Sequence, residues 1–158
     1  YRNSFIRNLD ILKEVLRDRG WKESDVVIVG GSVLEVFGLR EADDIDIIVK
    51  SKYRDSCGTQ MMKLTDEIDL CAEDNIYDEH NRLYKDDVII EDENFHFKFY
   101  NLKFLNPEIL KAKKLHDGRK KDLIDVRLFE ILENYAMNFD NKYVLRKQID
   151  KELHLRRF

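Results

Sequence analysis

The chain has 158 residues, of which 43% are hydrophobic and 38% are charged, and its formal net charge is −4. This length suffices for one domain with a proper core, and the hydrophobic content excludes a disordered chain. Acidic and basic residues are interspersed, so the composition indicates no general attraction to nucleic acid. No apolar run approaches the roughly 18 residues of a membrane helix, which predicts a protein without a membrane span.

The cysteines and the start of the chain bear on the cellular context. Cys57 and Cys71 have no C-x-x-C partner, so we expect reduced thiols and neither a disulfide nor a zinc site. The chain shows no signal-peptide pattern, which predicts a cytoplasmic location. It starts at Tyr1 without a Met, in a segment that already has helical periodicity, so we expect a domain from a longer protein.

The first elements follow from hydrophobic periodicity. Apolar residues recur at helical spacing between Phe5 and Leu16, and Gly20 is a typical helix end. A buried strand is expected at Asp25–Val29, a short helix at 32–37 and a second strand at Asp44–Val49. The polar segment Lys50–Gln60 predicts a loop or a lid.

The middle of the chain alternates as strands do. Glu67–Cys71 predicts a third strand with Asp69 on the face opposite Ile68 and Leu70. The polar stretch Asp74–Asp87 predicts a surface excursion. A hairpin is then expected between Val88–Ile90 and 95–100 across a Glu-Asp-Glu-Asn turn, with its three phenylalanines in the core and not serving as a base-stacking platform.

The last third predicts helices. Asn106-Pro107-Glu108 is a typical helix start, and this helix ends near Asp117-Gly118. A longer helix begins near Arg119, and its expected buried stripe is Ile124, Leu128, Ile131 and Tyr135. The fold class is therefore α+β (or α/β), with helices packed on a small mixed sheet in a domain spanning residues 1–137. A C-terminal helical extension, residues 138–158, carries an apolar stripe (Tyr143, Leu145, Ile149, Leu153 and Leu155) suited to packing on the domain or on a second chain.

One stretch, from Val26 to Val49, concentrates the chemistry. A strand is followed by Gly30-Gly31-Ser32, a short helix and a second strand that carries Asp44 and Asp46. Side chains alternate along a strand, so these two carboxylates share a face and repel each other unless a cation lies between them. Oxygen ligands favour Mg²⁺ or Mn²⁺ over zinc. The glycines allow close approach to a phosphate, and Ser32 is suited to capping the helix or contacting a phosphate oxygen.

This stretch, GGSVLEVFGLREADDID, resembles the G-[GS]-S and D-x-D signature of the DNA polymerase β-type nucleotidyltransferase superfamily. The segment Lys111–Val126, KAKKLHDGRKKDLIDV, resembles an element of the AbiEii-like branch, which together with the minimal nucleotidyltransferases is the nearest group. The resemblance implies a nucleotidyltransferase fold that binds a nucleoside triphosphate and two Mg²⁺ or Mn²⁺ ions. It assigns metal binding and catalysis to Asp44, Asp46 and an acid on the neighbouring strand, for which Asp69 is the candidate and Glu67 the rival.

The resemblance also implies a phosphate-binding set on the basic side of the site. Lys114 and the Lys121-Asp122 pair carry over from the AbiEii-like element, and Asp125 shares their helix face. The turn at Gly30, Gly31 and Ser32 would steady the phosphates. Arg40 is expected either to contact phosphate or the acceptor, or to form a structural salt bridge, and His116 is expected at the surface.

The expected reaction is transfer of a nucleoside monophosphate from the triphosphate to a hydroxyl acceptor, with release of pyrophosphate. Neither the base nor the acceptor, which is RNA, a protein hydroxyl or a small molecule such as a glycan, follows from the sequence. The pattern GGS-x-x-E-x-F-G-L-R also resembles aminoglycoside nucleotidyltransferases and LicD/fukutin-like phosphosugar transferases. A different alternative is a catalytically idle binding module, with a protein partner on the basic cluster or the C-terminal helix.

Overall fold

The computed structural model describes residues 2–137 and 142–157, with side chains for 2–134 and 148–157. The helices are α1 (Asn3–Arg19), α2 (Gly31–Val36), α3 (Asp86–Glu91), α4 (Pro107–Asp117), α5 (Lys120–Met137) and α6 (Lys142–Arg156), with 3₁₀ turns at Glu23–Asp25, Ser51–Ser56 and Glu93–Phe95. The strands are β1 (Val26–Val29), β2 (Ile45–Val49), β3 (Met62–Lys63), β4 (Ile68–Leu70), β5 (Ile76–Tyr77), β6 (Leu83–Tyr84), β7 (His96–Phe99) and β8 (Leu102–Leu105).

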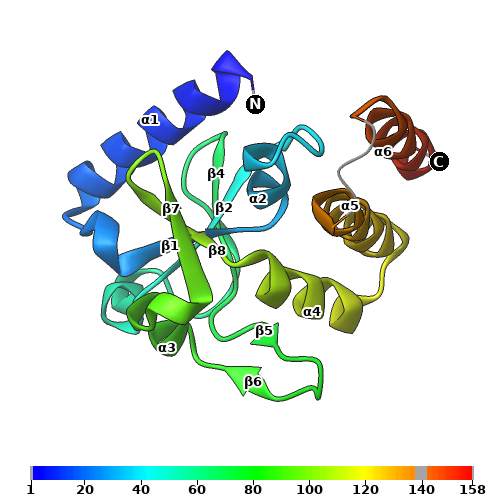
Figure 1. The fold of residues 1–158 in the computed structure, drawn as a ribbon. Helices are drawn as coiled ribbons and strands as arrows, with labels where there is room; N and C mark the ends of the chain where they lie inside the picture. The colour runs from blue at the N-terminus through cyan, green and yellow to red at the C-terminus, as the bar shows by residue number, and fades with distance from the viewer. Residues whose placement is uncertain (1, 138–141, 158) are drawn as a thin grey trace.

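A mixed sheet lies at the centre of the molecule, between α1 and the group formed by α4, α5 and α6 (Figure 1). Its strand order is β3-β4-β2-β1-β8-β7, and β5 pairs separately with β6. β1 runs antiparallel to β2 and parallel to β8, while β2 runs parallel to β4. The expected α+β class with a mixed sheet is therefore confirmed.

Helix α1 covers one face of the sheet through the apolar stripe that its sequence predicts. Phe5, Leu9, Leu12 and Leu16 are all buried, and the ring of Phe5 lies 6.4 Å from those of Phe99 and Phe104. The helix ends at Gly20, whose φ of 70° is the left-handed conformation of a C-cap.

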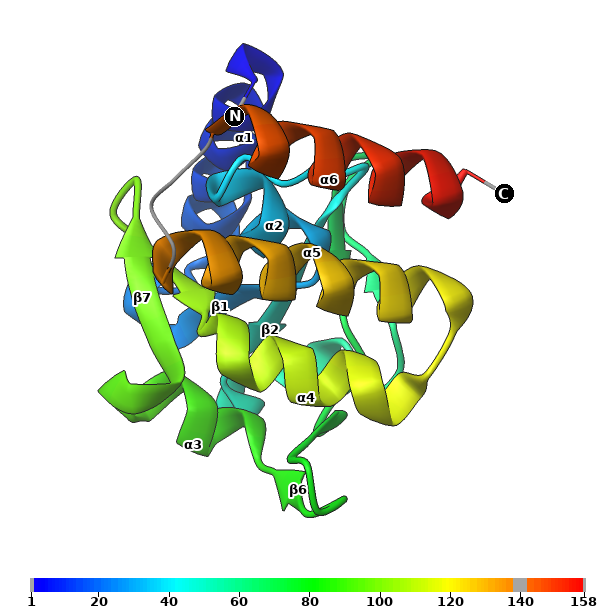
Figure 2. The ribbon, with the colours of Figure 1, turned by 45° about the vertical axis from the view of Figure 1, so that its right-hand side comes forward.

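Helices α4, α5 and α6 form a row of neighbours on the other side of the molecule (Figure 2). Ile149 of α6 is buried in the common core, and Arg127 of α5 donates to Glu152 of α6 at 2.9 Å. Leu153 packs partly against the core, whereas Leu155 is 41% exposed. The C-terminal helix thus packs on this chain's own α5. The side chains of Tyr135, Tyr143 and Leu145 lie outside the described residues.

The expected hairpin between Val88–Ile90 and 95–100 is wrong. Val88–Ile90 belongs to α3, where Ile89 and Ile90 are buried, because Asp86 and Asp87 provide the acidic first turn that favours a helix start. The partner of β7 is β8, for which no strand was expected. The turn between them is Tyr100-Asn101, with positive φ at both residues as in a type I′ hairpin.

The segment Lys50–Gln60 is a loop that connects β2 to β3, and part of it has regular structure. Ser51–Ser56 forms a 3₁₀ turn, and buried Arg54 donates to the carbonyls of Gly58, Gln60 and Cys71. The hydrogen bond to Cys71, the residue directly after β4, holds the segment against the sheet.

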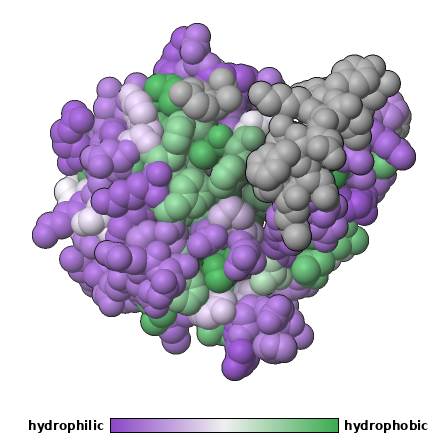
Figure 3. All heavy atoms as spheres, viewed as in Figure 1, coloured by the Kyte–Doolittle hydropathy of each residue, from purple (hydrophilic) through white to green (hydrophobic). Residues whose placement is uncertain are grey.

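The surface in the view of Figure 1 is mostly hydrophilic, with one hydrophobic area near the middle, around β7 (Figure 3). Phe37, which follows α2 and is 40% exposed, packs against Phe97 of β7 with ring centroids 5.5 Å apart. Cys57 and Cys71 are both free thiols, as expected.

Candidate functional site

A pocket of about 410 Å³ lies between the sheet and helices α4 and α5. The Gly30-Gly31 turn, the ends of β2 and β4, and the facing sides of the two helices line it. Apart from Ser32, every residue expected in the site from the sequence lines this pocket. These residues are Asp44, Asp46, Asp69, Gly30, Gly31, Arg40, Lys114, Lys121 and Asp122.

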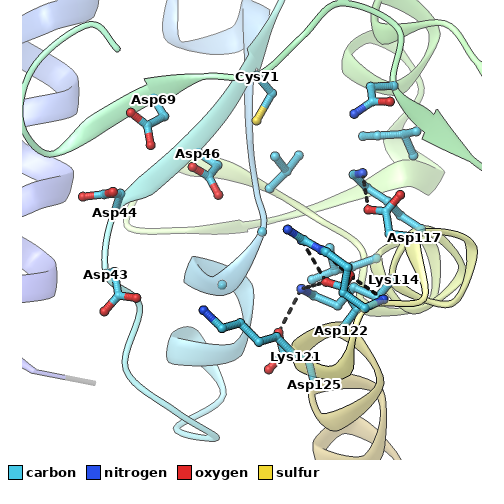
Figure 4. Close-up of a pocket in the computed structure, with 18 of the residues that line it drawn as sticks. Asp43, Asp44, Asp46, Asp69, Cys71, Lys114, Asp117, Lys121, Asp122 and Asp125 are labelled. Atoms are coloured by element: carbon cyan, nitrogen blue, oxygen red, sulfur yellow. Dashed lines mark hydrogen bonds and ion pairs between the residues drawn. The ribbon is translucent and has the colours of Figure 1, made fainter. Parts of the chain in front are cut away.

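Asp46 and Asp69 are brought together by strand register. They are direct partners in the parallel pair of β2 and β4, so their side chains emerge side by side on the pocket face (Figure 4). Glu67, the rival for the third acid, does not line the pocket; its carboxylate accepts from the Thr65 hydroxyl at 3.0 Å. The structure therefore favours Asp69 over Glu67.

Asp44 lies just before β2 and is oriented differently. Its side chain is 41% exposed and points away from Asp46 (Figure 4). Lys63 lies 3.9 Å from the Asp44 carboxylate and 3.1 Å from that of Asp69. Within 2–137 and 142–157, no three His, Cys, Asp or Glu side chains are gathered as a ready metal site.

Burial and neighbouring negative charges make ionisation of Asp46 unfavourable. Burial and the negative charges of Asp69 and Asp44 raise the pKa of Asp46 to about 6, against the opposing attraction of Lys114 and Arg40. A cation between the carboxylates would relieve both effects. The carboxylate oxygens of Asp44, Asp46 and Asp69 are ligands that suit Mg²⁺ or Mn²⁺. For all three to bind one ion, the Asp44 side chain would have to rotate away from Lys63 and toward Asp46.

Each of the two glycines lies close against a different side chain. A Cβ on Gly30 would lie 2.5 Å from the Asp46 carboxylate, and a Cβ on Gly31 would lie 2.8 Å from the Arg40 guanidinium. The turn is thus shaped to accept the acidic strand on one side and Arg40 on the other. Ser32 caps nothing: it is fully buried, and its hydroxyl donates to the Asp44 carbonyl at 3.4 Å.

The opposite end of the pocket is a buried network centred on Asp125. Arg40 donates to both Asp125 oxygens, at 2.8 and 2.9 Å, and Lys114 lies 2.9 Å from Oδ2. Burial opposes ionisation of Asp125, but the hydrogen bonds from Arg40 and the charge of Lys114 outweigh it and lower the pKa. Arg40 therefore forms the salt bridge that was one of its two expected roles.

Asp122 extends the network along α5. It accepts two side-chain bonds from Arg119, at 2.7 and 3.1 Å, and lies 3.5 Å from Lys114. Burial is again outweighed, here by Arg119 and Lys114, so the pKa of Asp122 is lowered. Lys114 is thus held between two carboxylates, while Lys121 is exposed at the rim.

Several pocket residues had no functional expectation from the sequence. Asp125 was placed only on a shared helix face, although the second Asp of KDLID marks it. Asn75 and Ile76 line the pocket from the polar excursion, and Arg156 lines it from α6. Arg156 follows no motif, so only packing reveals it. His116 is a surface residue as expected, stacked on Tyr77 at 4.4 Å.

Comparisons of the chain with protein families, with curated proteins and with solved structures found no match. In the described part of the chain, no helix is long and apolar enough to cross a membrane.

Proposed function

We propose that the protein is a metal-dependent nucleotidyltransferase with the fold of the DNA polymerase β-type superfamily. The observation that carries the proposal is the pairing of Asp46 with Asp69 across β2 and β4, directly beside a Gly-Gly turn where a Cβ would lie within 3 Å of the Asp46 and Arg40 side chains. The same pocket ends in the cations Lys114 and Lys121. An acidic end and a basic end in one pocket suit a metal-bound triphosphate, which carries charges of both signs.

Asp44, Asp46 and Asp69 would hold Mg²⁺ or Mn²⁺, which when bound neutralises phosphate charge and lowers the pKa of an acceptor hydroxyl. Lys114, oriented by Asp122 and Asp125, neutralises charge on the departing phosphates. The acceptor hydroxyl gives up its proton to water as its oxygen bonds to the α-phosphorus, the bond from that phosphorus to the bridging oxygen breaks, and pyrophosphate leaves. The acceptor is RNA, a protein hydroxyl or a small molecule such as a glycan.

The test is transfer of label from each α-³²P nucleoside triphosphate to components of a cell extract, with Mg²⁺ or Mn²⁺. We expect metal-dependent labelling that falls about a hundredfold or more in Asp46→Asn and in Asp69→Asn, because each removes a carboxylate from the metal end. Asp55→Asn is the matched control, since Asp55 is exposed and outside the pocket, and it should keep full activity.

The pattern of results separates the alternatives. Labelling that survives both pocket variants would contradict the proposed site. Metal-dependent nucleotide binding without any transfer would instead identify a binding module. If neither binding nor transfer occurs with any nucleotide, a phosphosugar donor becomes the substrate class to test.

A further inference from the structure

Arg156 joins the C-terminal helix to the pocket. It lines the pocket described above and also a second hollow, of about 1010 Å³, beside α6 and the connection from α2 to β2. The two hollows share Arg40, Asp43, Lys121 and Arg156. The end of α6 that carries Arg156 lies beside the start of α5, where the basic end of the pocket is formed (Figure 2).

The charged partners of Arg156 are already occupied. Its Nε lies 3.4 Å from Asp125 Oδ1, but that oxygen already accepts from Arg40 at 2.8 Å. Asp125 Oδ2 is taken by Arg40 and Lys114, both at 2.9 Å. The Nε of Arg156 is buried and has no hydrogen-bond partner within the described residues. Arg156 is therefore the least satisfied cation of the network.

Charge counting leads to the same residue. Arg40, Lys114, Arg119 and Arg156 contact two carboxylates, Asp122 and Asp125. Arg40 is held in a bidentate pair and Arg119 is held by Asp122, which leaves positive charge at Lys114 and Arg156. The Arg156 side chain is 23% exposed and lines both hollows, so an anionic ligand in the pocket can reach its guanidinium and balance this excess positive charge.

We propose that Arg156 binds the terminal phosphates of the nucleotide, so that α6 is a wall of the active site. This inference rests on the proposed function. The carboxylates at the far end of the pocket would attract phosphate oxygens only through a bound metal ion, whereas Lys114, Lys121 and Arg156 attract them directly. A guanidinium also matches two phosphate oxygens at once, which a lysine cannot do.

The test measures binding of inorganic pyrophosphate, with Mg²⁺, to the full chain by calorimetry. Arg156→Gln should weaken binding roughly ten- to a hundredfold, the range expected for a lost charge-assisted pair. Arg156→Lys should recover part of the affinity, because lysine restores the positive charge but not the two parallel N–H donors of the guanidinium. Binding of a nucleoside monophosphate should change less than twofold in either variant.

Two controls separate contact from helix docking. Arg157→Gln changes the neighbouring residue, which lines only the second hollow, and Arg127→Gln removes the bond to Glu152 that ties α5 to α6. Both should bind pyrophosphate within about twofold of the parent protein. An equal loss in Arg127→Gln would overturn direct contact in favour of helix docking.

The remaining outcomes distinguish this inference from the proposed function. Unchanged pyrophosphate affinity in Arg156→Gln overturns the inference even if label transfer is intact. An equal loss for the nucleoside monophosphate also overturns it, because Arg156 would then contact another part of the nucleotide. Pyrophosphate binding that depends on Arg156, in a protein that transfers no label, supports the contact and contradicts the transferase proposal.

Discussion

Gly30 links the turn to the acidic strand at the scale of single atoms. Its φ of 72° and ψ of −152° define a backbone conformation that is open almost only to glycine, and a Cβ there would lie 2.5 Å from Asp46 Oδ2. Gly38 has nearly the same φ, 71°, but a Cβ on it would meet nothing within 4 Å. The two positions therefore share a positive φ, and only the Cβ at Gly30 would clash with Asp46.

We expect Gly30→Ala and Gly38→Ala each to lose about 1–3 kcal/mol of unfolding free energy, because alanine is strained at positive φ. Gly30→Ala alone should also lose metal-dependent nucleotide binding by at least about tenfold, because the Asp46 carboxylate must move. Urea unfolding and nucleotide titration measure the two effects. Equal loss of binding in both variants would show that the clash is unimportant.

Asp46 makes the stability of the metal-free protein depend on pH. Its pKa is about 6 in the folded state against an ordinary value of 3.8, so the folded state binds more protons between these values. Stability should therefore fall as the pH rises from about 4 to 6, by roughly 2–3 kcal/mol from this residue. Asp46→Asn should be more stable than the parent at pH 8 in EDTA, and similar to it at pH 4. If the difference in stability between Asp46→Asn and the parent is the same at pH 4 and at pH 8, this account is refuted.

At the scale of elements, Asp125 ties α5 to three other parts of the chain. Its carboxylate contacts Arg40 before β2, Lys114 on α4 and Arg156 on α6. Asp117, by contrast, forms an i,i+4 pair with Lys113 near the surface. The two aspartates allow a comparison of buried and exposed ion pairs in adjoining helices.

Asp125→Asn should reduce the unfolding free energy by about 3–5 kcal/mol, because it leaves buried cations without their counter-charge. Asp117→Asn should cost no more than about 1 kcal/mol. Denaturant unfolding at neutral pH and low salt checks both values. A loss below about 1 kcal/mol for Asp125→Asn would mean that the cations around Asp125 move to positions where water solvates them.

At the scale of the whole molecule, α6 is packed as part of the fold. Ile149 is 5% exposed, whereas Leu155 on the same helix is 41% exposed. Trp21, the single tryptophan, is buried between α1 and β1, and its ring lies 5.5 Å from that of Tyr53. Tryptophan fluorescence and helix content therefore report on different parts of the molecule.

Ile149→Ala should cost about 2–4 kcal/mol, and Leu155→Ala about 0.5 kcal/mol or less. In both variants the fluorescence of Trp21 and the far-ultraviolet circular dichroism should change at the same denaturant concentration, as one cooperative unit requires. Loss of helix signal before the fluorescence change would instead mark α6 as a separately unfolding extension.

Local patterns were sufficient for much of the candidate site. Strand alternation placed Asp69 opposite Ile68 and Leu70, and helix signals placed the ends of α1 and α4 at Gly20 and Gly118. The prediction of a strand at Val88–Ile90 is wrong because three apolar residues fit a helix or a strand equally well. The acidic residues that precede this run favour the start of α3, and the strand that pairs with β7 is β8.

The sequence by itself determined the Gly30-Gly31 turn and the alternation of acidic side chains, because both depend on backbone geometry within a few residues. Only the tertiary structure decided that Asp69 pairs with Asp46 and that Glu67 does not. It also decided that Arg40 meets Asp125, 85 residues away, and that Arg156 reaches the same carboxylate from α6. These contacts depend on how the sheet and helices pack, and no local periodicity encodes which distant charges that packing brings together.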